Sequence, residues 1–236
     1  SEMCIRDRNY TNVTVSNRYL NREARFYNTV FFNGRQWPVT CKQVQFYNGG
    51  NAGVQEGQAT TTGYMLFKRF NRSISKTSPG VASQNRPSII FRLADFYLIY
   101  AEVANEVNPS DSRVLTYLNL VRERAGLPKV EVLNPGIVGN KELQRAAIQR
   151  ERQIELATEG QRYFDVRRWM IADKDGEGRQ NGYAHGMNVR GTINDTEEFN
   201  RVVETEKIVF NRKMYLQPIP DHEMRKTQNL VQNPGW

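Results

Sequence analysis

Residues 89–107 read IIFRLADFYLIYAEVANEV, and this stretch decides the fold. Its large apolar side chains recur at the i, i+3, i+4 and i+7 spacing of one helix face. The pattern therefore predicts an amphipathic helix, and Asn108-Pro109 is expected to end it because proline cannot continue a helix. Such a helix needs a neighbouring element that covers its apolar face.

The next segment supplies that neighbour. The same period continues in Val114, Leu115, Leu118, Val121 and Ala125. Ser110 or Asp111 can cap the start of this second helix, and Gly126 followed by Leu127-Pro128 is expected to stop it. Because only two to four residues separate the two helices, they are expected to pack antiparallel as a helical hairpin.

A second pair of helices is predicted after a Pro/Gly loop over residues 129–139. Asn140 can cap a helix that runs to about Ala157, Gly160 interrupts the pattern, and a short helix then covers about 163–170. Two such pairs resemble tetratricopeptide-type stacking, although the chain has no clean 34-residue repeat. The sequence therefore predicts a mainly α fold with tetratricopeptide-like helix pairs, long loops and few short strands.

The flanking thirds lack this periodicity. Residues 9–88 contain short β-prone runs, Phe26–Phe32 and Val44–Tyr47, broken by the turn signals Asn33-Gly34 and Asn48-Gly49-Gly50-Asn51. Residues 173–236 are expected to be loops and a C-terminal tail, with one short strand over Lys213–Gln217. The organisation is thus a loop-rich region at 9–88, helical hairpins at 89–172, and loops beyond.

Composition excludes several classes of protein. The chain has 236 residues, 39% of them hydrophobic and 11% aromatic, which excludes a mostly disordered chain. No apolar run approaches the ~20 residues that a membrane-spanning helix needs. Lys and Arg number 33 against 25 Asp and Glu, a net charge of +8. A basic excess of this kind is compatible with nucleic acid as a partner. The sequence has no helix-turn-helix, zinc-finger or RRM signature, however, and acids lie near the arginines. Nucleic-acid binding is therefore not expected.

Metal sites find little support. The two cysteines, Cys4 and Cys41, form no CxxC motif, and the chain has only two histidines. Residues 173–184 begin like an EF-hand loop, but Ala184 stands where a bidentate glutamate is needed. A polar loop is the favoured interpretation, and neither metal nor cofactor is expected.

The densest charge cluster lies between Arg150 and Arg168. Glu151 and Glu155 are four residues apart and share a helix face, so they could form a general acid–base pair. The alternative is a set of ion pairs that fixes one helix against the next. Arginines surround these acids and lower their pKa values, whereas an acid catalyst needs a raised one, so the structural interpretation is favoured.

The first third carries a candidate ligand site. Trp37, Phe46 and Tyr47 lie beside turns and a Gly/Asn-rich loop, where rings are hard to bury, with Arg35 and Asn48 next to them. Aromatic faces together with amide and guanidinium groups suit a sugar, whose C–H face stacks on a ring and whose hydroxyls accept and donate hydrogen bonds. These five residues are the predicted ligand-binding set. The alternative is that the rings fold into a small local core.

Several motifs, in order along the chain, resemble the SusD/RagB family. Matching segments are RLADFYLIYAE at 92–102, LNLVRERAGLP at 118–128, the E-R-x-x-E-L and R-W elements at 150–169, YLQPIP at 215–220 and QNPGW at 232–236. Residues 21–27, NREARFY, resemble a D-P-R-F-type stretch with Glu23-Ala24 where Asp-Pro is usual. The resemblance covers about residues 17–236 and corresponds to the C-terminal half of a usual family member.

The resemblance implies a SusD-like fold and a surface lipoprotein of Bacteroidetes-type bacteria. Such a protein captures glycans or other nutrients and passes them to a SusC-like, TonB-dependent outer-membrane transporter, and it is not an enzyme. Residues 1–8, SEMCIRDR, are expected to be a non-native leader, with the signal peptide and lipid-anchored cysteine lying before residue 1. Helix faces that normally pack on N-terminal helices should then be exposed, on residues 89–107 or 113–125.

Two other functions stay open on the sequence. One is a tetratricopeptide-like structural or peptide-binding module, which uses a helical groove and needs no glycan site. The other is a glycoside hydrolase, which needs two carboxylates ~5–10 Å apart in an open cleft. No such carboxylate pair stands out in the sequence.

Overall fold

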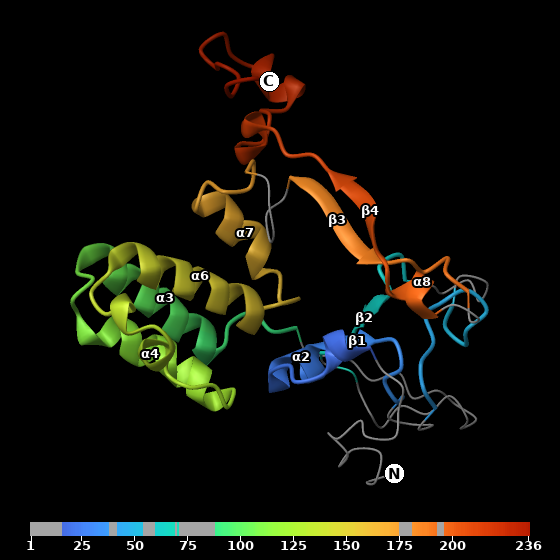
Figure 1. The fold of residues 1–236 in the computed structure, drawn as a ribbon. Coiled ribbons are helices and arrows are strands. Elements are labelled where there is room, and N and C mark those ends of the chain that lie inside the picture. The colour runs from blue at the N-terminus through green and yellow to red at the C-terminus, as the bar shows by residue number, and fades with distance from the viewer. Residues whose placement is uncertain are drawn as a thin grey trace.

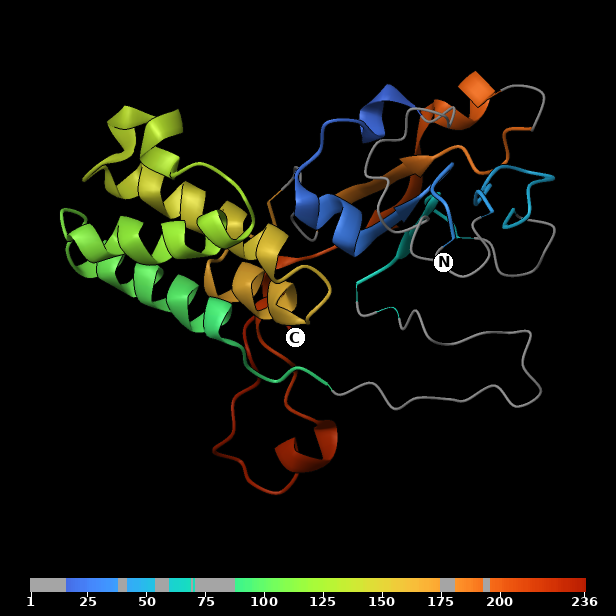
Figure 2. The same ribbon diagram turned by 90° about the horizontal axis from the view of Figure 1, so that it is seen from below.

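The computed structural model describes residues 16–37, 42–53, 60–68, 70, 88–174, 181–192 and 196–236. In chain order the elements are η1 (Asn17–Tyr19), α2 (Ala24–Thr29), β1 (Val30–Phe32), β2 (Tyr64–Leu66), α3 (Leu93–Val107), α4 (Ser112–Arg124), α5 (Val130–Leu133), η3 (Pro135–Ile137), α6 (Lys141–Glu155), α7 (Gln161–Arg168), β3 (Gly182–Met187), α8 (Thr196–Asn200), β4 (Val202–Ile208), η4 (Arg212–Tyr215) and α9 (Asp221–Met224). Helices α3, α4 and α6 gather on one side, and β1, β2, α2 and α8 lie on the other (Figures 1 and 2). The predicted mainly α fold with few short strands is confirmed.

The predicted helix boundaries agree with the capping chemistry. The Asp111 side chain accepts a hydrogen bond from the Arg113 amide at 2.9 Å and caps α4, and Asn140 caps α6 through the Leu143 amide at 3.1 Å. Gly126 follows α4 with φ of +75°, the left-handed conformation that glycine adopts without a steric penalty. Polar side chains at both starts thus fix where the helices begin.

α3, α4 and α6 pack around one apolar core (Figure 1). Leu98 and Ala101 of α3, Val114 and Leu118 of α4, and Ile148 of α6 are fully buried. Each large aliphatic side chain buried in this way contributes about 1.5–3 kcal/mol relative to exposure. The two predicted helix pairs therefore form one helical unit, with α7 following α6 after the Gly160 turn.

α3 begins later than its apolar pattern predicts. Arg92 has an extended backbone, with φ of −148° and ψ of +156°, and Leu93 is the first helical residue. The Arg92 guanidinium reaches the carboxylates of Glu155 and Glu159 at the end of α6. Ile89 and Ile90 consequently lie outside the helix, although their spacing fits its period.

One side of α3 is apolar and exposed. Ile90 and Val107 are 72% and 81% exposed, and the side chains between them on this side are exposed as well: Phe91, Leu93, Phe96 and Val103. Exposed apolar side chains thus lie on residues 89–107, as the sequence predicts, and a patch larger than that of a typical monomer stays a prediction. The opposite side of α3 packs on α4 and α6. Among the described residues, no element covers the exposed side in the same way.

The first third departs from the predicted strands. α2 covers residues 24–29 and so takes in the first four residues of the β-prone run Phe26–Phe32. Only residues 30–32 pair as β1 with β2, antiparallel with Phe31 opposite Met65. Arg25 explains part of the difference, because in α2 its guanidinium reaches Glu151 and Glu155 of α6. Val44–Tyr47 forms no strand, and neighbouring residues make only isolated bridges.

The last third holds a sheet that the periodicity did not predict. β3 and β4 pair antiparallel from Gly182 opposite Ile208 to Met187 opposite Val202, as a ribbon between α7 and the strand side (Figure 1). The predicted strand over Lys213–Gln217 is wrong: residues 212–215 form the 3-10 turn η4. Asn211 caps this turn, and Trp236 donates its indole N–H to the Lys213 and Leu216 carbonyls, holding the tail against it.

Candidate functional site

Phe46 and Tyr47, two rings of the predicted ligand site, are core residues. They are 1% and 7% exposed, in an aromatic cluster with Phe31 and Phe67. Met187 and Phe199 complete this cluster from a segment about 140 residues later in the sequence. The premise that these rings lack a place to be buried is therefore wrong, because a distant part of the chain covers them. Burial also raises the pKa of the Tyr47 hydroxyl.

The other three predicted residues border the same aromatic cluster. Trp37 is half-buried and meets Phe31 and Phe70 edge-on, with ring centroids 5.2 and 4.8 Å apart. The Arg35 guanidinium lies 3.9 Å from the centre of the Phe67 ring and donates to the Val30 carbonyl. Asn48 is half-buried, and its backbone amide donates to the Gly191 carbonyl. Ligand contact by Trp37, Arg35 and Asn48 stays a prediction.

The charged cluster joins the helical unit to the first third. Glu155 accepts from Arg92 at 2.6 Å and from Arg25 at 3.0 Å, and also from Arg124. Glu159 pairs with Arg92 at 2.6 Å and with Lys68 at 2.5 Å. Arg25 and Lys68 come from the first third of the chain, so these ion pairs hold the two regions together.

Two of these acids are held ionised. Burial raises the pKa of the Glu155 carboxyl, but hydrogen bonds from Arg92 and Arg25 outweigh burial and leave this pKa below its ordinary value. Burial likewise raises the pKa of Glu159, but Arg92 and Lys68 lower it by more, so this pKa also lies below its ordinary value. A general acid at neutral pH needs the opposite shift. The geometry therefore supports the structural interpretation of this cluster.

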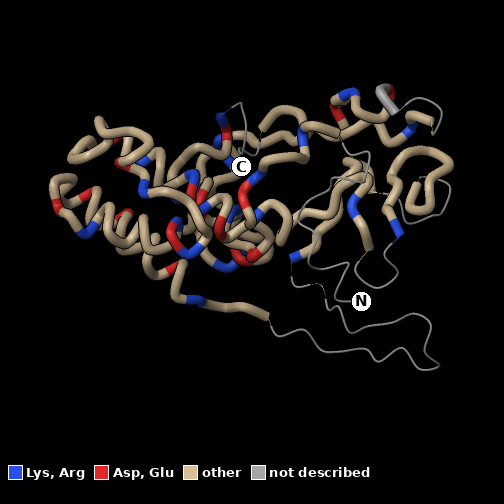
Figure 3. Tube along the Cα trace, turned by 60° about the horizontal axis from the view of Figure 1, so that its bottom comes forward, with Lys and Arg blue, Asp and Glu red and all other residues tan. Residues whose placement is uncertain are grey.

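A second ionic group binds α3, α6 and α7 to one another. Arg152 is 2% exposed and donates to Asp95 at 2.9 Å and to Asp165 at 3.0 Å. Arg168 reaches Asp165 and Glu102, and the Trp169 indole donates to Glu102 at 2.7 Å. Figure 3 shows the resulting interleaving of acidic and basic residues in the helical unit. The R-W element is thus part of the scaffold.

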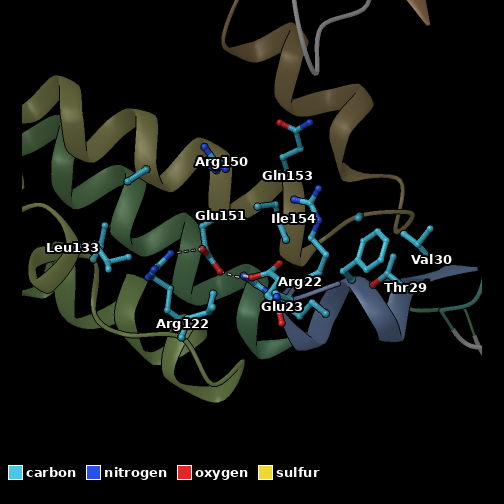
Figure 4. A pocket seen from close by; sticks show the side chains of 17 residues that line it. Arg22, Glu23, Thr29, Val30, Arg122, Leu133, Arg150, Glu151, Gln153 and Ile154 are labelled. Carbon is cyan, nitrogen blue, oxygen red and sulfur yellow. Dashed lines mark hydrogen bonds and ion pairs between the residues drawn. The ribbon is translucent and has the colours of Figure 1, made fainter. Parts of the chain in front are cut away.

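A cleft of about 720 Å³ lies between α2, the α4–α5 connection and α6. Figure 4 shows its lining, which comes from both regions of the molecule. Its apolar part consists mainly of Phe26, Leu127, Val130, Leu133 and Ile154. The volume falls in the ~300–1,000 Å³ range of small-molecule sites. The cleft is therefore large enough for a ligand and sits where the first third meets the helices.

Guanidinium groups dominate the polar lining of the cleft. The buried Glu151 carboxylate receives Arg25 at 2.5 Å and Arg122 at 3.2 Å (Figure 4). Arg22 and Arg150 line the same cleft and are exposed. No sequence motif brings these residues together, because Arg22 and Arg150 lie 128 positions apart and meet only when α2 packs near α6. Sequence reasoning assigned Arg150 to the charged cluster and gave Arg22 no role.

The described residues contain no group of three or more His, Cys, Asp or Glu side chains that could hold a metal ion. Half of the EF-hand-like segment, residues 175–180, lies outside the described residues, as does the suspected leader at 1–8. Asp173 accepts a hydrogen bond from the Tyr215 hydroxyl at 2.5 Å. No helix in the described part is long and apolar enough to cross a membrane.

Comparison with known proteins identifies the family. The model of the SusD family matches residues 6–236. The chain belongs to the SusD family. A SusD-like protein of Formosa agariphila is 44% identical over 106 residues, which is 45% of this chain and 19% of that relative. The chain thus spans about a fifth of the length of this curated relative.

Solved structures give the same fold. A SusD-like protein from Bacteroides fragilis superposes with a TM-score of 0.73 at 28% identity, covering 92% of this chain and 40% of the other. A SusD-like carbohydrate binding protein from the same organism gives 0.68 at 25% identity, covering 90% and 42%. The arrangement of α3, α4, α6 and the β3–β4 ribbon therefore belongs to the family fold.

Proposed function

We propose that this protein is a surface component of a nutrient-uptake system that binds glycans. It would be lipid-anchored at the outer membrane and pass its ligand to a SusC-like, TonB-dependent transporter. The observation that carries the proposal is membership of the SusD family over residues 6–236, with a carbohydrate-binding member of that family among the solved structures it resembles. Transporter, anchor and location follow from the family resemblance, and we propose them together with the ligand class.

The geometry of the acids favours binding over catalysis. A glycoside hydrolase needs one carboxylic acid with a raised pKa and a second carboxylate facing it across an open cleft. Glu155 and Glu159 have lowered pKa values and are occupied by arginine and lysine, and Glu151 is held between two arginines. We therefore assign no catalytic role to this cluster.

A peptide-binding, tetratricopeptide-like module is the second candidate. One observation favours it, which is the exposed apolar side of α3 with Phe91, Leu93, Phe96 and Val103. Such a module binds an amphipathic segment in a helical groove and has no use for oligosaccharides. Binding of a glycan by the protein would separate the two candidates directly.

The test is calorimetry of the full-length protein against a panel of oligosaccharides. We expect at least one glycan to bind, and Trp37→Ala to weaken that binding several-fold, because a stacked ring contributes about 0.5–1.5 kcal/mol beyond its buried area. Tyr183→Ala is a matched control, since this exposed ring lies on β3 and is not part of the aromatic cluster that Trp37 borders. Absence of binding across the panel would contradict the proposed function, and unchanged affinity in Trp37→Ala would remove Trp37 from the site.

A further inference from the structure

The cleft between α2 and α6 is lined by more arginines than its ion pairs involve. Four arginines line it, Arg22, Arg25, Arg122 and Arg150, against two acids, Glu23 and Glu151. Both acids are already occupied. Glu151 lies between Arg25 and Arg122, and Glu23 accepts from Arg25 at 2.9 Å. Neither carboxylate pairs with Arg22 or Arg150.

Arg22 and Arg150 retain donors for a ligand. The Arg22 backbone amide donates to the Tyr27 hydroxyl at 3.2 Å, and its side chain donates through Nε to the Arg18 carbonyl at 2.8 Å; the terminal Nη atoms have no partner within the described part of the chain. The Arg150 side chain makes no hydrogen bond or ion pair to any residue that the structure describes, and Gln153 lies exposed one turn later on the same helix. The rim of the cleft thus offers two guanidinium groups and an amide.

The rest of the lining is apolar. Phe26, Leu127, Leu133 and Ile154 contribute to it, and Figure 4 labels Leu133 and Ile154. A guanidinium donates two parallel hydrogen bonds to a planar or tetrahedral oxyanion, whereas apolar side chains accept the C–H faces of a sugar ring. Neutral sugars need no unpaired guanidinium groups, and a simple anion needs no apolar surface.

We infer that this cleft binds an acidic oligosaccharide, whose carboxylate or sulfate groups contact Arg22 and Arg150. The inference rests on the proposed glycan-binding function and names a substrate class, at a site whose lining does not include Trp37. The net charge of +8 favours approach of such a ligand. Arg25, Glu151 and Arg122 act as positioning residues, because their ion pairs fix the two walls of the cleft against each other.

The test uses the full-length protein and three probes measured by calorimetry at low salt: oligogalacturonides for carboxylate, carrageenan oligosaccharides for sulfate, and xylo-oligosaccharides as the neutral arm. The double variant Arg22→Gln/Arg150→Gln removes both exposed guanidiniums. The matched control, Arg113→Gln/Arg225→Gln, removes two exposed arginines outside the cleft, with side chains 61% and 79% exposed, and gives the same net charge. Circular dichroism and melting of both variants check folding.

We expect an acidic probe to bind, to lose about tenfold in affinity or more in Arg22→Gln/Arg150→Gln, and to keep its affinity in the control. Added salt should weaken this binding. Equal losses of affinity in both double variants would reflect net charge alone and would overturn the inference. Binding of the neutral xylo-oligosaccharides alone would also overturn the inference, but it would leave the proposed function intact. Binding of no glycan in these arms or in the wider panel would refute both.

Discussion

The helical unit and the first third of the chain are built by different rules. In α3, α4 and α6 the core positions recur within each helix, and the caps Asp111 and Asn140 stand directly before the helices they start. In the first third the core is made of single rings from separate segments, completed by Met187 and Phe199 from the far end of the chain. The local sequence pattern therefore specifies the helical unit, whereas long-range packing specifies the first third of the chain.

The largest expected loss of stability follows from changing Arg152, the buried cation of the helical unit. Arg152→Met leaves the buried Asp95 without its ion-pair partner and leaves Asp165 with Arg168 alone, so we expect a loss of about 3–5 kcal/mol in the free energy of unfolding. Urea denaturation measures it. Arg225→Gln, which breaks an exposed pair with Asp221, is the control and should change stability by less than about 1 kcal/mol. Similar small losses in both variants would show that the Arg152 group is dispensable.

A change of comparable size tests the aromatic region. Phe46→Ala removes a fully buried ring from the cluster with Phe31 and Phe199 and should cost about 3–5 kcal/mol, because the surrounding side chains cannot close the cavity. Trp37→Ala, at the half-buried edge of the same cluster, should cost less. A Phe46 variant with unchanged stability and lost glycan binding would restore Phe46 to the ligand site.

The two regions also differ in how much of them the sequence could predict. The amphipathic pattern of 89–107 predicts α3, and the caps Asp111 and Asn140 with the Gly126 stop place the start of α6 and both ends of α4 to within about a residue. Phe46 and Tyr47 look exposed beside Asn48-Gly49-Gly50 because Met187 and Phe199, which complete the cluster around them, come from much later in the chain. The start of α3 at Leu93 was missed for a related reason: Arg92 is held extended by acids about 60 residues away. The cleft, assembled from Arg22 and Arg150, has no local signal.

Acid should weaken the connection between the two regions. The carboxyls of Glu155 and Glu159 have pKa values below the ordinary 4.5, so their contribution to stability is complete above about pH 4.5 and is lost as pH falls through the lower folded-state values. Urea unfolding between pH 7 and pH 3 should show a steeper loss for the parent than for Glu155→Gln/Glu159→Gln. Parallel pH profiles would contradict this assignment.

The smallest expected effect concerns a single cap. Asn140→Ala removes the side chain that accepts the Leu143 amide at the start of α6 and should cost about 1 kcal/mol, because that amide loses its partner. Thermal melting followed by circular dichroism measures the change. Asn140→Asp keeps the acceptor and should retain most of the stability. Equal melting temperatures for all three proteins would mean that α6 does not depend on its cap.

The central claim is that Glu155 and Glu159, which join the two regions, are scaffold and contact no ligand. Glu155→Gln in the full-length protein tests it most directly, with melting temperature and glycan affinity measured on the same sample. We predict a lowered melting temperature, because Arg25, Arg92 and Arg124 lose their shared carboxylate, and retained glycan binding below the melting range. An unchanged melting temperature with lost binding would contradict the account and place Glu155 in the functional site.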